Sequence, residues 1–564
     1  MKKSLSFFIF TVALLQGCQS NPNRSEPVSL EPVTYTPGEF NRESLYDLML
    51  AELAGQRRMF PIALEKYLHQ TEKTRDPLIA ERATRIAQYL RDSEKTLLAA
   101  QLWREIATDN PEPYQIEANI LLHKKQYDAA LPLVRKALEY DALRTLALIR
   151  TQSDQIDSTT QAEYIKMLQS YGSEQPPRAD LELTLALLYK AAGREQLALS
   201  AFNRALDIEP NNPEALIQKA ELLRSDNDIN GALDLIQTAF EQQPENRQLH
   251  ILYTQLLFQA EQSKKGVMQA ETLLQKNIKD HQLTYYLALL LLENEAPESA
   301  KTAFRRLLEL KPQDSSPHFY LGHIAQAEGE KALALEHYTA VRNGSNILQA
   351  LSRAAGLLKA PEDKEQVHLI LAEARSELPK QAPNIFTLEA EWLDLHDYRE
   401  EAHSLLEEAL EQYTDNTTLL YTRAMLVEST DFPQAERDLQ RILQLEPENA
   451  TVQNALGYTL LLHTERYSEA YELIQAALNQ EPEDPAILDS MGWVLFKMGR
   501  AQEALPYLEK AHNLYADPEV SSHLIQVYWA TDQKERARGL LKRSLETSPD
   551  SPFLEEAAQF LESE

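Results

Sequence analysis

The sequence predicts an all-α protein in which repeated helix pairs stack into a solenoid. A 34-residue period runs through most of the chain, and only 15 of the 564 residues are glycine. Alanine, leucine, glutamate and glutamine are abundant, as expected for helices. A single helix pair cannot bury its apolar face alone, so successive pairs are expected to share one continuous core. The chain has one cysteine, which excludes internal disulfides, and its stability must come from packing.

Each repeat carries small residues at unit positions 8, 20 and 27 and a proline near position 32. In residues 179–212 these positions hold Ala186, Ala198, Ala205 and Pro210. Small side chains let two antiparallel helices approach closely, while bulky apolar residues at positions 4, 7, 11 and 24 fill the space between them. Proline ends the second helix because it lacks the N–H and clashes with the preceding turn.

The same pattern recurs along the chain in one frame. It is clearest in residues 450–484, with Gly457, Ala477 and Pro482. Further blocks in this frame are residues 213–246, 281–314, 383–415, 416–449 and 485–517, and weaker ones are residues 145–178, 247–280 and 349–382. The pattern resembles the tetratricopeptide repeat, which has the same length and the same order of small and large residues. The resemblance covers about Ser44 to Pro549 and implies a right-handed superhelical α-solenoid of helix–turn–helix units.

The repeat array is therefore predicted to occupy residues 41–549. After Pro549, an apolar stripe that includes Phe553, Leu554 and Leu561 alternates with glutamates. This pattern predicts a capping helix over residues 550–564, with one face on the last repeat and the other in water.

The N-terminus has the features of a secretory signal. Two lysines precede an apolar run from Leu5 to Leu15, which is too short to span a bilayer. Leu15-Gln16-Gly17-Cys18 then resembles the lipobox of bacterial lipoproteins. The resemblance implies a signal peptide over residues 1–17 and lipidation of Cys18. The alternative is an ordinary thiol inside a signal that is removed whole.

A tether is expected between the lipidated cysteine and the repeats. Prolines recur among polar residues in segment 18–40, at positions 22, 27, 32 and 37, and this spacing does not allow a continuous helix. Gln19 stands where an aspartate would retain a lipoprotein of enterobacterial type in the inner membrane. The resemblance therefore favours the periplasmic face of the outer membrane, with the inner membrane left open.

Composition and motifs argue against nucleic-acid binding and against catalysis. The formal net charge of −30 repels phosphate backbones and serves either solubility or attraction to basic periplasmic proteins. The sequence has no zinc-protease motif, no phosphate-binding loop and no nucleophile elbow, and its 13 histidines are scattered. We expect no enzyme, no cofactor and no metal site.

A protein-binding groove is the expected functional feature. In the tetratricopeptide family the first helix of each unit lines a concave surface through unit positions 2, 5, 9 and 12. In the C-terminal units, the candidate binding residues at these positions are Asn454, Tyr458, Asp489, Trp493, Phe496 and Trp529. Large rigid rings often dominate binding energy. The alternative interpretation is that these rings pack between neighbouring repeats.

The order of signal, lipobox, proline-spaced tether and repeats resembles one group of lipoproteins in Gram-negative bacteria. Members of that group bind a periplasmic carboxyl-terminal processing protease. The resemblance implies an outer-membrane adaptor that promotes degradation of substrates such as peptidoglycan cross-link hydrolases. Two alternatives are an assembly lipoprotein of pilotin type, for an envelope pore or pilus, and a repeat protein associated with a glycan-modifying enzyme.

Overall fold

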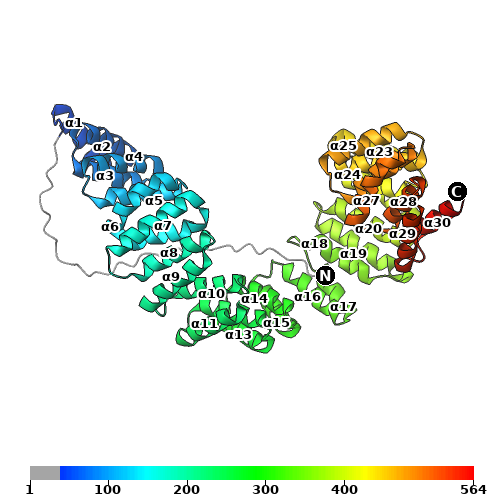
Figure 1. The fold of residues 1–564 in the computed structure, drawn as a ribbon, viewed down its shortest axis with the longest axis horizontal. Coiled ribbons are helices and arrows are strands. Elements are labelled where there is room, and N and C mark those ends of the chain that lie inside the picture. The colour runs from blue at the N-terminus through cyan, green and yellow to red at the C-terminus, as the bar shows by residue number, and fades with distance from the viewer. Residues whose placement is uncertain (1–37, 564) are drawn as a thin grey trace. The chain divides into compact units, whose positions relative to one another are not determined.

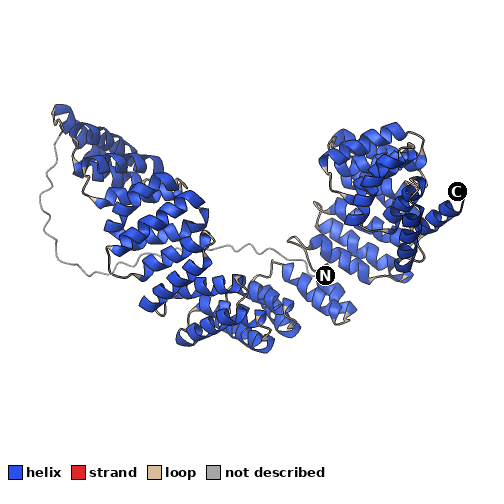
Figure 2. Ribbon diagram, in the orientation of Figure 1, coloured by secondary structure: helices blue, strands red, loops and turns tan. Residues whose placement is uncertain are grey.

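The computed structural model describes residues 38–563, which form 30 α-helices, two short 3-10 helices and no strand (Figure 2). The predicted all-α repeat fold is confirmed. The predicted signal peptide, Cys18 and nearly all of the predicted tether lie outside the described residues, so these remain predictions. The chain divides into two compact units, which meet in sequence between Gln262 and Ser263.

Unit 1 is a stack of helix pairs that starts with α1 (Figure 1). Its helices are α1 (Arg42–Gln56), α2 (Phe60–Thr74), α3 (Pro77–Tyr89), α4 (Ser93–Ile106), α5 (Pro111–His123), α6 (Tyr127–Gln152), η1 (Ser153–Gln155), α7 (Ser158–Ser173), α8 (Ala179–Ala191), α9 (Glu195–Ile208), α10 (Pro213–Ser225), α11 (Ile229–Gln242) and α12 (Arg247–Gln259).

Unit 2 continues the pairing through to the C-terminal helix (Figure 1). Its first helices are α13 (Ser263–Lys276), α14 (His281–Glu293), α15 (Pro297–Leu310), α16 (Ser316–Ala327), α17 (Lys331–Thr339), α18 (Ile347–Leu357), η2 (Pro361–Asp363), α19 (Lys364–Glu377), α20 (Ala382–Leu395) and α21 (Arg399–Gln412). They are followed by α22 (Thr417–Val427), α23 (Phe432–Leu445), α24 (Ala450–His463), α25 (Tyr467–Gln480), α26 (Pro485–Lys497), α27 (Ala501–Leu514), α28 (Pro518–Ala530), α29 (Lys534–Thr547) and α30 (Pro552–Ser563).

Local sequence fixes where the helices begin and end. Several first helices start with proline after an aspartate or asparagine cap: Asn212 accepts a hydrogen bond from the N–H of Ala215, and Asp484 does the same for Ile487. Several second helices end shortly before a proline, as predicted: α9, for example, ends at Ile208 ahead of Pro210. These boundaries therefore follow from residues within one turn of them.

One helix departs from the repeat frame. α6 is two helices joined at Asp141, whose backbone is not helical (φ −146°, ψ 82°). The Asp141 carboxylate accepts a hydrogen bond from the N–H of Arg144 at 3.0 Å and so caps the second half. The weak repeat expected at residues 145–178 is therefore a helix pair made of the second half of α6 and α7.

The small positions of the repeats are where paired helices touch. Ala198 and Ala205 have no exposed surface, and the same holds for Ala504 and Ala511 in unit 2. At Gly492 of α26, an added Cβ would lie 2.5 Å from Cγ of Leu508 on α27. The two helices are thus already as close as their side chains allow.

We expect Gly492→Val to destabilise unit 2 by about 1–3 kcal/mol, because the new side chain overlaps Leu508 in a filled core. A lower unfolding midpoint in urea, followed by far-ultraviolet circular dichroism, would show this effect. Gly356→Ala on α18 is the control, since a Cβ there meets nothing within 4 Å and alanine favours the helix. Equal midpoints for both variants would contradict the close approach of α26 and α27.

Candidate functional site

The candidate site is a groove of about 870 Å³ on unit 1, formed by α1, α2 and α3. α1 and α3 are the first helices of two successive pairs. The groove lies at the N-terminal end of the array, is lined by first and second helices alike, and contains none of the binding residues predicted in the C-terminal units. Its lining residues are Leu48, Ala51, Glu52, Gly55, Gln56, Phe60, Tyr67, Leu78, Ile79, Glu81, Arg82, Arg85, Ile86 and Tyr89.

Accessible apolar side chains line this groove. Leu78 is 73% exposed and Tyr89 is 69% exposed, although both are large apolar or aromatic residues. The ring of Tyr89 packs against Phe60 of α2 with 4.7 Å between ring centroids, which holds it in place. A fixed, solvent-accessible ring is a suitable anchor point for a protein partner, because little side-chain entropy is lost on binding.

The charges at the groove are paired within the protein. Glu52 accepts a hydrogen bond from the Tyr67 hydroxyl and lies 3.3 Å from the guanidinium of Arg82. Burial, together with the Glu52 carboxylate, raises the pKa of Tyr67 to about 12, so this hydroxyl stays a hydrogen-bond donor. Arg85 likewise contacts Glu112 at 2.6 Å. The groove therefore has an apolar floor, and its charged groups are already satisfied.

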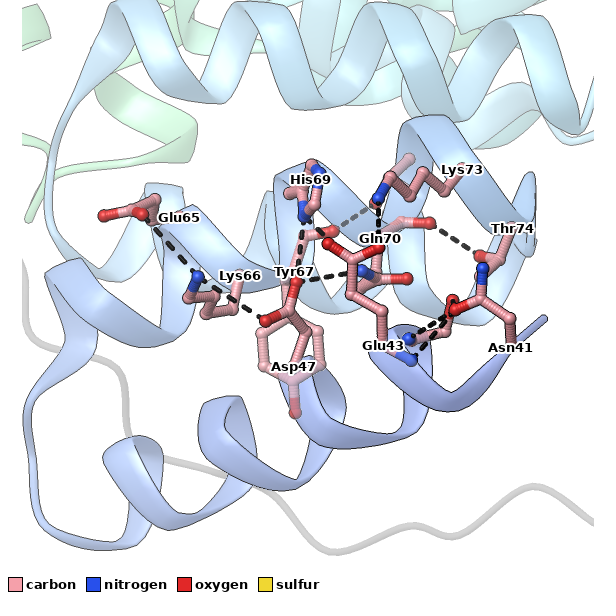
Figure 3. A network of polar contacts seen from close by, with 12 residues as sticks. Asn41, Glu43, Asp47, Glu65, Lys66, Tyr67, His69, Gln70, Lys73 and Thr74 are labelled. Carbon is pink, nitrogen blue, oxygen red and sulfur yellow. Dashed lines mark hydrogen bonds and ion pairs between the residues drawn. The ribbon is translucent and has the colours of Figure 1, made fainter. Parts of the chain in front are cut away.

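A buried polar network holds α1 on α2 behind this groove (Figure 3). Asp47 is only 5% exposed, and one of its oxygens lies 2.9 Å from Nδ1 of His69 and 3.0 Å from Nε2 of Gln70. Lys66 lies 3.5 Å from the other oxygen. Burial alone would raise the pKa of Asp47, but these hydrogen bonds and the lysine charge outweigh it and lower that pKa.

The structure places Asp489 and Trp493, two of the predicted binding residues, inside unit 2. Asp489 is buried and contacts Nδ1 of His523 on α28 at 2.9 Å. Trp493 is 4% exposed, and its ring stacks on His523 at 3.9 Å between centroids. In this structure the two side chains pack between neighbouring first helices, as the alternative interpretation expected. Their role in binding remains a prediction.

The other predicted residues lie nearby but differ in environment. Tyr458 is half-buried, and its hydroxyl donates to Glu519 of α28 at 2.5 Å, which joins first helices two repeats apart. Burial and the Glu519 carboxylate raise the pKa of Tyr458. Phe496 is half-buried and stacks on Trp493 at 5.2 Å. Trp529 is 7% exposed, and Asn454 is half-buried with Oδ1 unpartnered within the described chain.

Sequence reasoning missed His523 and Glu519, which complete this cluster. His523 follows Asp489 by 34 residues, the length of one repeat, so the two occupy matching places on successive first helices. A search for complementary polar residues one repeat apart would have found the pair. The N-terminal groove was also missed, because the candidate binding residues were taken from the C-terminal units alone.

Two chemical features are missing from residues 38–563. No group of three or more His, Cys, Asp or Glu residues there is arranged to hold a metal ion. None of the helices in that range is long and apolar enough to cross a bilayer.

The repeat pattern of the tetratricopeptide family matches residues 189–256, 285–347 and 426–493. A TPR repeat-containing protein of Pseudomonas aeruginosa, PA4667, is 34% identical over 538 residues, which cover 93% of this chain and 90% of that protein. The chain belongs to the tetratricopeptide-repeat proteins. A shorter match, 42% identical over 71 residues, links 13% of the chain to 17% of a probable biofilm formation methyltransferase of Pseudomonas putida.

Solved structures give weaker likenesses. Yeast Tom70 aligns over 92% of this tetratricopeptide-repeat chain and 99% of its own, with 13% identity and a TM-score of 0.33. A tetratricopeptide repeat protein from Parabacteroides merdae aligns over 44% of this chain and 99% of its own, with 16% identity and a TM-score of 0.34. These values are too low to support an argument about function.

The Asp47 network predicts a specific pH dependence of unit 1. A carboxylate with a lowered folded-state pKa contributes stability that is complete above its ordinary pKa of about 3.9 and is lost as the pH falls through the folded value. Asp47→Asn should therefore weaken α1 by about 1–3 kcal/mol at pH 7, and by progressively less as the pH falls below the ordinary pKa of the carboxyl.

Hydrogen exchange of α1 peptides, corrected for intrinsic rates, measures this difference. Glu65→Gln on the exposed side of α2 is the matched control and should leave exchange unchanged. A gap between wild type and Asp47→Asn that stays constant from pH 7 to pH 3 would show that the charge of Asp47 does not stabilise α1.

Proposed function

We propose that this tetratricopeptide-repeat protein is a lipid-anchored scaffold that binds a protein partner in the groove between α1, α2 and α3. The observation that carries the proposal is the combination of exposed anchors, Leu78 and Tyr89, with internally paired charges around them. A partner segment that enters this groove buries apolar surface without having to neutralise a charge. Segments with one or two large apolar side chains fit this chemistry best.

The finer proposal is an outer-membrane adaptor for a periplasmic carboxyl-terminal processing protease. It rests on the lipobox at Cys18, the proline-spaced tether and the repeat array that fills the rest of the chain. Such an adaptor holds the protease and its substrates, among them peptidoglycan cross-link hydrolases, close to one membrane. Confinement raises their effective concentration, so the adaptor speeds cleavage without contributing a catalytic group.

The binding proposal predicts that Leu78→Asp and Tyr89→Ala weaken the complex with the purified processing protease at least tenfold. Both substitutions remove exposed anchors, and a loss of about 1.4 kcal/mol corresponds to a factor of ten in Kd. Surface plasmon resonance against the immobilised full chain measures the change. Leu395→Ala in unit 2 is the control, because Leu395 is 80% exposed and lies outside the groove.

Two results would count against this function. If the wild-type chain does not bind the protease and does not raise its rate on a cell-wall hydrolase, the adaptor role fails. If binding is strong but unaffected by Leu78→Asp and Tyr89→Ala, the groove is not where the protease docks. Recovery of secretin or pilus components from periplasmic extract would instead indicate a role in envelope assembly.

The anchor is tested separately by Cys18→Ser. Without the thiol, the predicted lipidation cannot take place, so the variant should keep its signal or leave the membrane fraction. Membrane fractionation and mass spectrometry of the N-terminus measure both outcomes. Normal processing and normal membrane association of Cys18→Ser would contradict the lipid anchor and leave the binding proposal intact.

A further inference from the structure

The outer face of α1 carries a stripe of large apolar side chains in contact with solvent. The four that define it are Leu45, 50% exposed, Tyr46, 66%, Met49, 57%, and Leu53, 49%. Their spacing places them on one side of the helix. The opposite side holds the buried Ser44, Asp47, Ala51 and Ala54, which face α2. α1 is thus amphipathic with its bulkier apolar face outward, the reverse of an ordinary surface helix.

The next first helix shows what this face is suited for. Ile79 and Ile86 of α3 occupy the places of Tyr46 and Leu53, 33 residues further along the chain. Both isoleucines are half-buried, and they belong to the apolar cluster that contains Leu64 of α2. The second helix of the preceding pair, α2, packs against α3 and contributes Leu64 to the cluster that covers the two isoleucines. No helix precedes α1 within residues 38–563, so its corresponding face stays open.

We propose that this outer face of α1 docks an amphipathic α-helix of a partner protein, in the place that the second helix of a preceding repeat would fill. The docked helix would cover Tyr46 and Leu53 as the cluster around Leu64 covers Ile79 and Ile86 of α3, and it would reach Met49 on the same face. This site is distinct from the groove, whose lining does not include these three residues. A partner held here extends the solenoid by one helix.

Charge defines the flanks of the docked helix. Three exposed arginines lie at the ends of α1: Arg42 at its start, and Arg57 and Arg58 just after its end. None of them has a carboxylate within 4.0 Å in the described part of the chain. Residues 38–92 contain nine basic and nine acidic side chains, whereas the whole chain carries a net −30. A partner helix that has an apolar face and glutamates or aspartates at both ends is therefore complementary to α1.

Two occupants from this protein itself fit less well. The sequence before Gly38 has a proline at every fifth position from 22 to 37, a spacing that does not permit a helix of α2's length. A second copy of α1 would bring arginines of one chain against arginines of the other, since an antiparallel pair sets Arg42 beside Arg57 and Arg58. Like charges at both ends disfavour that pairing.

The test uses a designed probe, a fluorescent 18-residue helical peptide with leucines on one face and glutamates at both ends. Its binding to the full chain is measured by fluorescence anisotropy. We expect saturable binding that weakens at least tenfold with Leu53→Glu or Met49→Glu, and at least fivefold when the peptide's glutamates are replaced by lysines. Tyr89→Ala in the groove and Leu395→Glu in unit 2 are controls that should leave the affinity unchanged.

Leu53 and Met49 are about half exposed, so both variants should fold, and unchanged circular dichroism and unfolding midpoints establish this. Absence of saturable binding, or binding that Leu53→Glu leaves intact, overturns the proposal. The chain is also tested for sedimentation with phosphatidylethanolamine–phosphatidylglycerol vesicles. If it sediments with them and Leu53→Glu abolishes this sedimentation, the face binds a bilayer and the proposal is overturned. A concentration-dependent dimer that Leu53→Glu abolishes overturns it in favour of a second copy. None of these results depends on whether the groove binds the protease.

Discussion

The close approach of two helices at the small positions of each repeat is the constraint on which the rest of the structure depends. Such contacts are made by Ala198, Ala205 and Gly492, and Gly492 has no room for a Cβ. Because each pair touches only its neighbours, the core grows one repeat at a time. The same arrangement leaves one apolar face at each end of the array that no neighbouring repeat covers.

The two ends differ in whether that apolar face is covered. At the C-terminus, α30 packs on α28 and buries Leu554 and Ala557, so the last pair is covered. At the N-terminus, α1 keeps Tyr46 and Leu53 in solvent, while a polar network around Asp47 holds its inner face on α2. A helix fixed by buried hydrogen bonds does not need its large apolar residues for its own stability. Those residues are therefore free to serve a contact with another molecule.

The fold was predictable because the same pattern of small and large residues recurs every 34 residues. Weak units such as residues 349–382 could be assigned because the units on either side share their frame. The site was harder to predict. Asp489 and Trp493 lie on a first helix, as predicted, yet the structure buries them, because α28 approaches α26 closely enough for His523 to contact both side chains. That approach depends on how successive pairs curve, and the pattern of a single unit does not encode curvature.

Charge gives the N-terminal end of the array a second distinguishing property. Basic and acidic residues balance in the segment that contains α1 to α3, so the whole net negative charge is carried by the repeats that follow. A protein with an acidic surface is repelled by those later repeats but meets no net negative charge at α1, where three arginines have no carboxylate partner among residues 38–563. Electrostatic repulsion of an acidic protein is therefore weakest at the end of the array that carries both the groove and the exposed apolar face. Apolar contact then supplies the affinity that charge alone does not.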